Sequence, residues 1–364
     1  MNNQTKILIT GGGTAGHVIP TLAIIDALQK KANIKILYVG LRNGPEREII
    51  QKEDIDFTGI WAGKLRRYFS FQNFLDIFKT IIGIFQSFFI ILKFKPNAIF
   101  AKGGFVSVPV AFAGWILRKP TLLHESDSEI GIANRILLRF SKKIALGFPV
   151  EVYKNLPARK IVFTGNPVRA EFCDKNREHA RKAFNLTEKL PVLLVMGGSQ
   201  GARKINDVTF EILTRLLSQF QIIHIAGKLD FQKFESFYQE MPEILKINYK
   251  VFDFIDNISE AMISSDIVIS RAGANSMFEI AACKKPVILI PLEGHQENNA
   301  MVFSSEGAGV MIRNCDLNSS KLLENIINLW HDSDKRKFMS QKINEFFTPQ
   351  SSEQIADLIL ELTK

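Results

Sequence analysis

Two glycine-rich turns in this sequence have the composition of phosphate-binding loops. Residues 11–16 read Gly-Gly-Gly-Thr-Ala-Gly, and His17 follows them directly. Residues 197–201 read Gly-Gly-Ser-Gln-Gly, in which Ser199 adds a hydroxyl group. Backbone N–H groups left open at the start of a helix favour a phosphate through hydrogen bonding and the helix dipole. Both turns are therefore candidates for holding phosphate groups.

The first turn also fits the GxGxxG pattern of dinucleotide-binding Rossmann folds, through Gly11, Gly13 and Gly16. Those folds hold the ribose hydroxyls with an acidic residue at the end of the second strand. Here the second predicted strand ends Tyr-Val-Gly-Leu-Arg at residues 38–42, without a carboxylate. Arg42 keeps an NADP-dependent oxidoreductase open as an alternative. A tight turn that binds nothing is the other alternative.

The elements that must position these turns are short apolar runs alternating with stretches of helical spacing. A strand at residues 6–10 precedes the first turn, and the order strand, glycine turn, helix recurs from residue 191 to residue 217. Such alternation predicts parallel, doubly wound sheets, whose ligands lie at the carboxyl ends of the strands. We therefore predict an α/β protein of two Rossmann-like domains facing a cleft, residues 1–164 and 165–345. Residues 346–364 are expected to form a helix that packs back on the first domain.

Composition excludes several classes of protein. With 46% hydrophobic and 23% charged residues, the chain is an ordinary globular protein rather than a disordered or fibrous one. Three cysteines form no CxxC pair, and six histidines lack metal-ligand spacing, so we expect no disulfide framework, metal or cofactor. Asp54 and Asp56 are interpreted as part of a solvated loop rather than a metal clamp. The first residues do not resemble a signal peptide, which predicts a reduced, cytoplasmic protein.

Positive charge is concentrated in the first half of the chain. Residues 1–165 hold 23 basic and 11 acidic residues, and no acidic residue occurs from Ile77 to His124. A basic stretch suits either nucleic acid or an anionic membrane. Because this stretch consists mostly of Ile and Phe, it favours a membrane surface, and no nucleic-acid partner is expected.

Apolar residues between Phe74 and Leu92 recur at the three- and four-residue spacing of a helix. The charge-free run Thr80–Leu92 has 13 residues, fewer than the roughly 20 that span a bilayer, so we do not expect it to cross one. The alternatives are a helix buried against the sheet and a helix that docks on lipid. The residues predicted to form the membrane face are Phe78, Ile81, Phe85, Phe88, Lys93 and Trp115.

Six motifs, in this order, resemble those of one family. They are Gly11-Gly12-Gly13-Thr14-Ala15-Gly16-His17, Lys102-Gly103-Gly104-Phe105-Val106-Ser107, His124-Glu125, Gly165-Asn166-Pro167-Val168-Arg169, Gly197-Gly198-Ser199-Gln200-Gly201-Ala202 and Ser270-Arg271-Ala272-Gly273. The family is MurG, the GT-B-fold N-acetylglucosaminyltransferases of peptidoglycan synthesis, and the resemblance runs from about residue 6 to residue 345.

The resemblance implies an inverting, metal-independent transfer of GlcNAc from UDP-GlcNAc. The acceptor would be the C4 hydroxyl of undecaprenyl-diphospho-MurNAc-pentapeptide. Such an enzyme would be a peripheral protein at the cytoplasmic face of the inner membrane, with a role in cell shape and division. A glycolipid glycosyltransferase, a UDP-GlcNAc 2-epimerase and a non-enzymatic lipid-binding protein remain alternatives.

The resemblance also implies roles for individual residues. His17 would be the catalytic base, which contributes about 10²–10⁴ in rate; Glu125, near the acceptor diphosphate, is the second candidate. The acceptor diphosphate would contact Gly13, Gly103 and Gly104. UDP-GlcNAc would contact Thr14, Ala15, Gly16, Asp127, Arg169, Ser199, Ile255, Ala274, Asn275, Ser276, Met277, Phe278, Glu279 and Gln296.

Within that donor set, Arg169 would meet the nucleotide and the carboxylate of Glu279 would accept from the ribose hydroxyls. An ion pair for Arg169 and an exposed helix position for Glu279 are the structural alternatives.

Two residues depart from the family pattern. Ala15 replaces a common glycine, and Asp127 replaces a common asparagine, so it cannot donate as an amide does.

Overall fold

The structure is a computed structural model that describes residues 4–13, 15–63, 71–154, 156–173, 176–198 and 201–364. The side chains of Ala15, His17 and residues 71–75 lie outside the described part. The chain divides into two compact units. Unit 1 comprises Met1–Val168 with Thr348–Lys364, and unit 2 comprises Arg169–Phe347.

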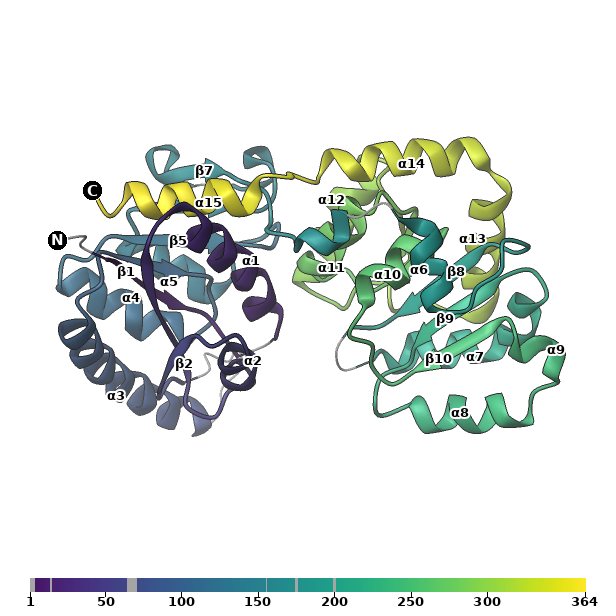
Figure 1. Ribbon diagram of the computed structural model, residues 1–364, viewed down its shortest axis with the longest axis horizontal. Helices are drawn as coiled ribbons and strands as arrows, with labels where there is room; N and C mark the ends of the chain where they lie inside the picture. The colour runs from purple at the N-terminus through teal and green to yellow at the C-terminus, as the bar shows by residue number, and fades with distance from the viewer. Residues whose placement is uncertain (1–3, 14, 64–70, 155, 174–175, 199–200) are drawn as a thin grey trace. The chain divides into compact units, whose positions relative to one another are not determined.

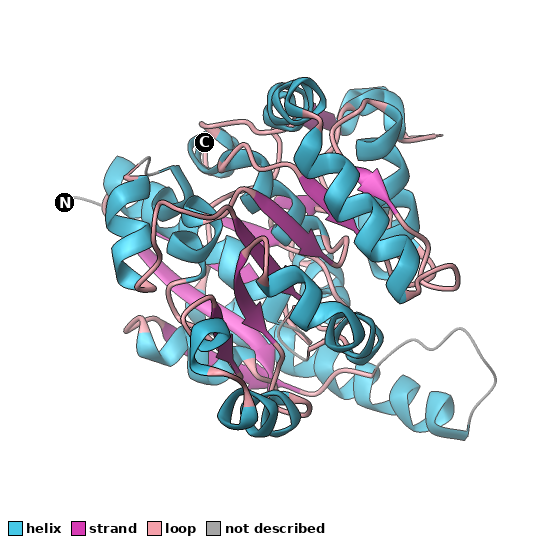
Figure 2. Cartoon of the chain, turned by 90° about the vertical axis from the view of Figure 1, so that its right-hand side faces the viewer, coloured by secondary structure: helices cyan, strands magenta, loops and turns pink. Residues whose placement is uncertain are grey.

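Unit 1 is built on a seven-stranded parallel sheet in the order β3-β2-β1-β4-β5-β6-β7. Helices pack on both faces of this sheet, and Figure 2 shows how helices flank the strands of the chain. The strands are β1 (Thr5–Thr10), β2 (Ile34–Leu41), β3 (Asp56–Ile60), β4 (Ala98–Ala101), β5 (Thr121–Glu125), β6 (Lys143–Leu146) and β7 (Ile161–Phe163). The helices are α1 (Ala15–Lys31), α2 (Glu46–Lys52), α3 (Phe71–Phe94), α4 (Ser107–Ile116), α5 (Ile132–Phe140) and α15 (Ser351–Glu361), with 3-10 turns at Val150–Val152 and Ala158–Lys160.

Alternate residues of β1 enter two different cores because successive side chains of a strand point to opposite faces. Ile7 and Ile9 pack with α1, α2 and α15, whereas Leu8 packs with α3 and α4. The C-terminal helix α15 lies along α1 (Figure 1) and contributes Ile355 and Ile359 to the first core. Unit 1 is therefore completed by the last residues of the chain.

Helix α3 contacts the rest of unit 1 through a stripe of residues that are four positions apart. Gly83 lies so close to the backbone of Trp61 that a Cβ atom would come within 1.9 Å of its carbonyl oxygen. Ser87 and Ile91 follow on the same side and are buried. The opposite side of the helix is exposed, so α3 covers the sheet with one face only.

Helix α3 is also longer than the charge-free run suggests. Within the described residues, its segment Asp76–Phe94 is 19 residues long, with a mean hydropathy of 1.8. By length and composition alone that segment could cross a membrane, which corrects the expectation that rested on a 13-residue run. The helix extends past Lys79 at one end and Lys93 at the other, whereas the charge-free run stops between these two charges.

Unit 2 is built on a six-stranded parallel sheet in the order β10-β9-β8-β11-β12-β13. The strands are β8 (Val192–Met196), β9 (Gln221–Ile225), β10 (Tyr249–Phe252), β11 (Ile267–Ser270), β12 (Val287–Leu289) and β13 (Val310–Met311). The helices are α6 (Arg177–Ala183), α7 (Arg203–Leu217), α8 (Phe231–Glu240), α9 (Glu243–Lys246), α10 (Ile258–Ser264), α11 (Ala274–Ala282), α12 (His295–Ser305), α13 (Ser319–His331) and α14 (Ser333–Glu345), and a 3-10 turn spans Ala170–Cys173.

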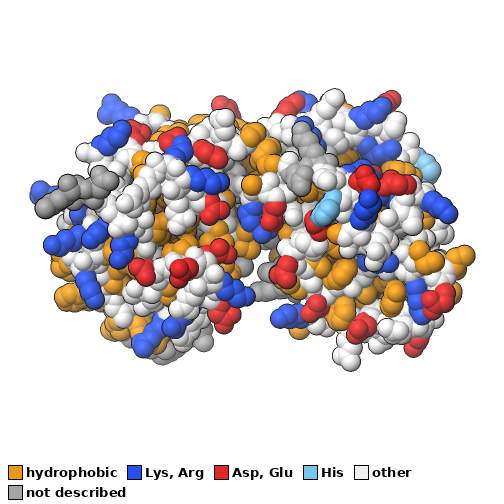
Figure 3. Space-filling view, viewed as in Figure 1, with side chains coloured by type: hydrophobic (Ala, Val, Ile, Leu, Met, Phe, Trp, Pro, Cys, Tyr) orange, Lys and Arg blue, Asp and Glu red, His pale blue; other side chains and the backbone are white. Residues whose placement is uncertain are grey.

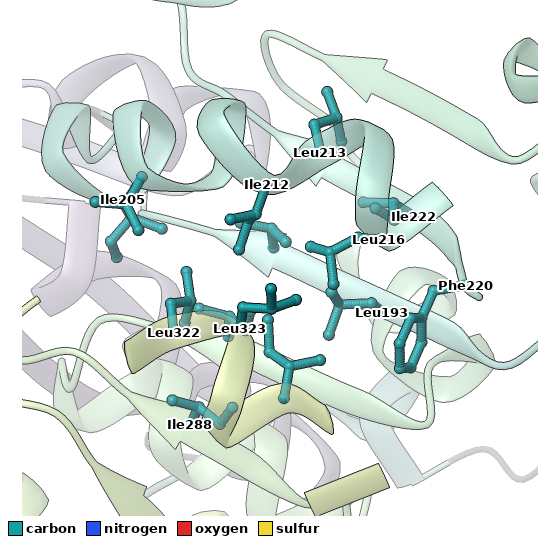
Figure 4. Packing of buried hydrophobic residues seen from close by; sticks show 14 of the residues in the cluster. Leu193, Ile205, Ile212, Leu213, Leu216, Phe220, Ile222, Ile288, Leu322 and Leu323 are labelled. Atoms are coloured by element: carbon teal, nitrogen blue, oxygen red, sulfur yellow. The ribbon is translucent and has the colours of Figure 1, made fainter. Parts of the chain in front are cut away.

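The main core of unit 2 lies between its sheet and helices α7 and α13. Figure 4 shows Ile212 and Leu216 of α7 directed toward Leu193 of β8. Leu322 and Leu323 of α13 approach from the other side of the cluster (Figure 4). This packing fixes the sheet whose carboxyl ends carry the second glycine turn.

Candidate active site

The carboxyl ends of the central strands of unit 1 bring three of the motifs together. Thr10 of β1 pairs with Ala101 of β4, and Ala101 pairs with Leu123 of β5. The N–H of Lys102 donates to the carbonyl of Thr10 at 2.8 Å. Residues that follow these strands therefore share one edge of the sheet, as the sequence predicted for parallel strands.

A buried carboxylate holds the first glycine turn in place. Glu46, at the start of α2, is fully buried and accepts from the N–H of Leu41 at 2.7 Å and from the N–H of Gly13 at 3.3 Å. A Cβ atom on Gly12 would lie 2.2 Å from the carboxylate, so a larger residue there would displace Glu46 from these hydrogen bonds. The N–H of Gly13, which was predicted to hold the acceptor diphosphate, thus has an internal acceptor.

The turn after β4 approaches the first glycine turn closely. Gly104 has a φ of +81°, and a Cβ atom on it would lie 2.6 Å from the carbonyl oxygen of Gly12. Gly103 has a φ of +103°, with Asn134 at 2.8 Å from the position of a Cβ atom. Both positions need glycine for conformation and for space. The two turns consequently form one backbone surface at the edge of the sheet.

Lys102 is buried beside this surface. Its Nζ atom lies 2.8 Å from Nδ1 of His124 and donates to the hydroxyl of Ser126 at 2.7 Å. Burial lowers the pKa of Lys102 to about 7, against the opposing attraction of Glu125 and Asp127. A lysine whose pKa lies near neutrality is present in both its charged and its neutral form under physiological conditions.

Glu125 ends β5 and is also buried. Its Oε1 accepts from the N–H of Asp127 at 3.0 Å, and its Oε2 accepts from the N–H of Gly131 at 3.1 Å and the amide of Asn134 at 2.8 Å. Burial raises the pKa of Glu125 to about 7, and the charge of Asp127 adds to this, although these hydrogen bonds oppose it. Glu125 therefore fixes the segment after β5 and has a pKa suited to proton transfer.

The predicted unit 1 residues gather at this edge as far as the structure describes them. The backbone of His17 is the third residue of α1, directly after the turn, and Gly16 is exposed. Thr14 lies outside the described residues. Asp127 joins Glu125 through its N–H, and its carbonyl accepts from the hydroxyl of Tyr153 at 2.8 Å.

In unit 2, Arg169 and Glu279 lie near one another. Nη2 of Arg169 is 3.9 Å from Glu279, and Nη1 is 3.0 Å from Glu171. The guanidinium carbon also lies 5.1 Å from the centre of the Phe172 ring. Burial raises the pKa of Glu279 to about 7, Arg169 lowers it, and Glu171 raises it. These contacts place a cation beside a carboxyl group that titrates near neutrality.

The predicted donor residues of α11 differ in exposure. Ala274, Met277 and Phe278 are buried, and the Phe278 ring packs edge-on against Phe303 at 5.8 Å. Asn275, Ser276 and Glu279 are half-buried. The side chains of Met277 and Phe278 enter the core, and the N–H of Met277 donates to the carbonyl of Gly273 at 3.1 Å, so neither side chain is available to a ligand.

Three further residues were predicted to contact the donor: Ser199, Ile255 and Gln296. Ser199 is among the residues that the structure does not describe. Ile255 follows β10 and is half-buried. The side-chain oxygen of Gln296, at the start of α12, accepts from the N–H of Leu292 at 3.1 Å.

Several charged residues that hold the loops of the two units together were assigned no role from the sequence. Arg271, directly after β11, donates to the carbonyl of Ile290 at 3.0 Å and to Asn314 at 2.8 Å, which ties three loops of unit 2 together. Glu46 and Lys102 have the same kind of role in unit 1. Lys102 and Arg271 stand in two of the six motifs, which was the available signal for them, whereas Glu46 lies outside the motifs. Among the described residues, no group of three His, Cys, Asp or Glu side chains is arranged to hold a metal ion.

The predicted membrane face is exposed for the most part. Phe78, Ile81 and Phe85 on α3 and Trp115 on α4 are exposed, as is Lys93. Phe88 is half-buried and packs on the core beneath α3, while its neighbour Phe89 is 67% exposed. Hydrophobic, Lys and Arg side chains mix on the surface of unit 1 (Figure 3).

The chain matches two domain models of one family. It matches the glycosyltransferase family 28 N-terminal domain over residues 7–146 and the glycosyltransferase family 28 C-terminal domain over residues 192–355. A protein of Bacillus thuringiensis subsp. konkukian is 42% identical, with 93% of this chain and 95% of that protein covered. It is named UDP-N-acetylglucosamine--N-acetylmuramyl-(pentapeptide) pyrophosphoryl-undecaprenol N-acetylglucosamine transferase 2.

Solved structures share the fold. The crystal structure of MurG from Acinetobacter baumannii has a TM-score of 0.77 at 23% identity, with 98% of this chain and 99% of that chain covered. UDP-GlcNAc 2-epimerase of Neisseria meningitidis has a TM-score of 0.70 at 15% identity, with 98% and 100% covered. The predicted fold class, two Rossmann-like parallel-sheet domains of the GT-B type, is confirmed.

Proposed function

This chain belongs to glycosyltransferase family 28, and from that membership we propose that it transfers GlcNAc from UDP-GlcNAc to undecaprenyl-diphospho-MurNAc-pentapeptide in peptidoglycan synthesis. The observation that carries this function is the 42% identity to a transferase of that name over 93% of the chain, which spans both units. A 2-epimerase shares the fold only, at 15% identity. An NADP-dependent oxidoreductase is less well supported, because the N–H of Gly13 already donates to Glu46.

In this reaction the acceptor's C4 hydroxyl attacks the anomeric carbon of GlcNAc as the bond to the UDP oxygen breaks. A single displacement inverts the configuration and needs a base for the hydroxyl proton. We assign that role to His17, whose backbone lies in the first turn of α1, at the edge shared with Lys102 and Glu125.

Unit 2 is assigned to the donor. Arg169 would pair with the nucleotide through charge-assisted hydrogen bonds, and ionised Glu279 would accept from the ribose hydroxyls. The first turn of α11 adds backbone N–H groups and the positive end of a helix dipole. No step in this scheme is assigned to a metal ion, and a chelator is therefore expected to leave turnover unchanged.

We further propose that unit 1 docks on the anionic cytoplasmic face of the inner membrane. The exposed side of α3 offers apolar area next to Lys93, and Trp115 lies on the neighbouring helix. The Gly83, Ser87 and Ile91 stripe packs the second half of α3 onto the rest of unit 1, which favours a helix lying on the membrane rather than across it. Roles in cell shape and division would follow from peptidoglycan synthesis.

The test is transfer of labelled GlcNAc to a purified polyprenyl-diphospho-muramoyl-pentapeptide, with and without chelator. His17→Ala is expected to leave the Kd for UDP-GlcNAc unchanged and to lower kcat by about 10²–10⁴, the usual contribution of a general base. His179→Ala, an exposed position in unit 2, is the matched control. Unchanged turnover in the His17 variant would remove it as the base, and no transfer by the wild type would refute the function.

A further inference from the structure

A cavity of about 500 Å³ lies in unit 1, away from the glycine turns. Its walls come from the amino ends of β1, β2 and β3 and from the last turn of α3. The carboxyl end of β1 carries the first glycine turn, so this cavity is at the opposite edge of the sheet. The lining residues are Lys6, Lys35, Leu37, Asp56, Phe57, Thr58, Ile90, Lys93 and Phe94.

The charged residues of this lining favour an anion. Three lysines face one carboxylate, that of Asp56. Lys35 lies 3.9 Å from Asp56, but both side chains are at least half exposed, and such a pair is weak. Nζ of Lys6 lies 5.8 Å from the centre of the Phe94 ring, a contact that leaves its hydrogen-bonding capacity available. The lining therefore carries a net positive charge of two, beside aromatic and aliphatic walls.

The position of the cavity selects among anions. Lys93 follows directly after Leu92, the last residue of the exposed apolar side of α3, which also carries Phe85 and Phe89. A molecule that fills the cavity with a phosphate group can thus lay hydrocarbon along α3. Inorganic phosphate has no hydrocarbon that could contact this apolar surface. An anionic phospholipid matches both parts, the charged cavity and the apolar helix.

We propose that this cavity binds the phosphodiester headgroup of an anionic phospholipid, with Lys6, Lys35 and Lys93 around the phosphate. The inference rests on the membrane docking proposed above and adds to it a defined headgroup site. General attraction between a basic surface and an anionic leaflet depends only on charge. A defined binding site, in contrast, distinguishes one headgroup from another by the positions of its lysines.

The probe is dihexanoyl phosphatidylglycerol below its critical micelle concentration, titrated into the full-length chain by calorimetry. Dihexanoyl phosphatidylcholine and inorganic phosphate are titrated separately. Lys35→Gln with Lys93→Gln is expected to weaken phosphatidylglycerol binding about twenty-five-fold, since each cation contributes about fivefold. Lys30→Gln with Lys52→Gln removes the same charge from exposed positions of α1 and α2, and is expected to bind as the wild type does.

Phe78→Asp with Phe85→Asp separates the two proposals. It should abolish vesicle binding yet keep binding of the soluble lipid, because both phenylalanines lie at least two helical turns from Phe94. Failure of the docking proposal would leave that soluble binding intact. The headgroup site is overturned if phosphatidylglycerol does not bind, or if phosphatidylcholine or phosphate binds equally well. Equal weakening by the two lysine pairs would overturn it too.

Discussion

Nζ of Lys102 lies 2.8 Å from Nδ1 of His124, and both side chains are essentially excluded from solvent. If the ammonium donates to Nδ1, the imidazole proton must be on Nε2, which faces the carbonyl of Gly165 at 3.4 Å. The Ser126 hydroxyl accepts a second hydrogen bond from Lys102. This network joins β4 to β5 and to the segment that contains Gly165. It lies beside the first glycine turn and the turn after β4.

Burial of Lys102 makes the stability of unit 1 depend on pH. The pKa of Lys102 is about 7 in the folded chain and near 10.4 when unfolded. Between these values the unfolded chain holds a proton that the folded chain lacks, so raising the pH stabilises the wild type relative to Lys102→Met. The gain is at most about 1.4 kcal/mol per pH unit and disappears below pH 7.

Urea unfolding of wild type and Lys102→Met at pH 6, 8 and 9 measures this difference. A Trp330→Phe background leaves Trp61 and Trp115 as reporters of unit 1. The difference in free energy of unfolding should change in favour of the wild type from pH 8 to pH 9. A difference that stays constant would show that Lys102 keeps an ordinary pKa.

Glu279 should make nucleotide binding depend on pH. Its pKa is raised to about 7 chiefly by burial, so it is mostly protonated at pH 6 and mostly ionised at pH 8. Only the carboxylate accepts from both ribose hydroxyls. We therefore expect UDP to bind more tightly at pH 8 than at pH 6, by at most about tenfold per pH unit below the pKa. Titration calorimetry gives the Kd at each pH.

Glu279→Gln is the matched variant, because the amide keeps the shape and cannot titrate. It should bind UDP more weakly than the wild type at pH 8 and equally at both pH values. If wild type and variant show the same pH profile, another group is responsible and Glu279 loses the ribose role.

The positions of the strands were predictable because parallel strands buried on both faces are continuous apolar runs that stop at glycine. The predicted runs 6–10 and 191–196 correspond to β1 (Thr5–Thr10) and β8 (Val192–Met196). These are local signals, and local signals are what a single sequence carries.

What the sequence left open depends on contacts between distant residues. Glu46 reads as an ordinary acidic residue in a first helical turn, yet its carboxylate accepts from Gly13, 33 residues away. Phe88 and Phe89 are indistinguishable by type, and only the packing of α3 turns one inward and the other outward. The roles of Arg169 and Glu279 likewise came from resemblance and not from spacing.

The C-terminal helix should be essential for the stability of unit 1. Ile359 of α15 is fully buried in the core that also contains Ile7, Ile9 and Leu28. Ile359→Ala leaves a cavity in that core and should cost about 2–5 kcal/mol. Gln354→Ala, on the exposed side of the same helix, should cost less than about 0.5 kcal/mol. Urea unfolding followed through Trp61 and Trp115 reports the change, and equal effects of both variants would contradict the packing.

Membrane docking through α3 makes a prediction that charge alone does not. Phe78→Asp with Phe85→Asp removes two exposed aromatic rings, at 51% and 63% exposure, from the helix. Burying a Phe side chain contributes about 1.5–3 kcal/mol, so losing two should weaken binding to anionic vesicles by at least about a hundredfold. Phe163→Asp with Phe254→Asp makes the same change in charge at exposed phenylalanines elsewhere. In sedimentation with phosphatidylglycerol vesicles, only the α3 variant should remain in the supernatant. If both variants are released alike, the added negative charge is the cause and α3 is not the docking face.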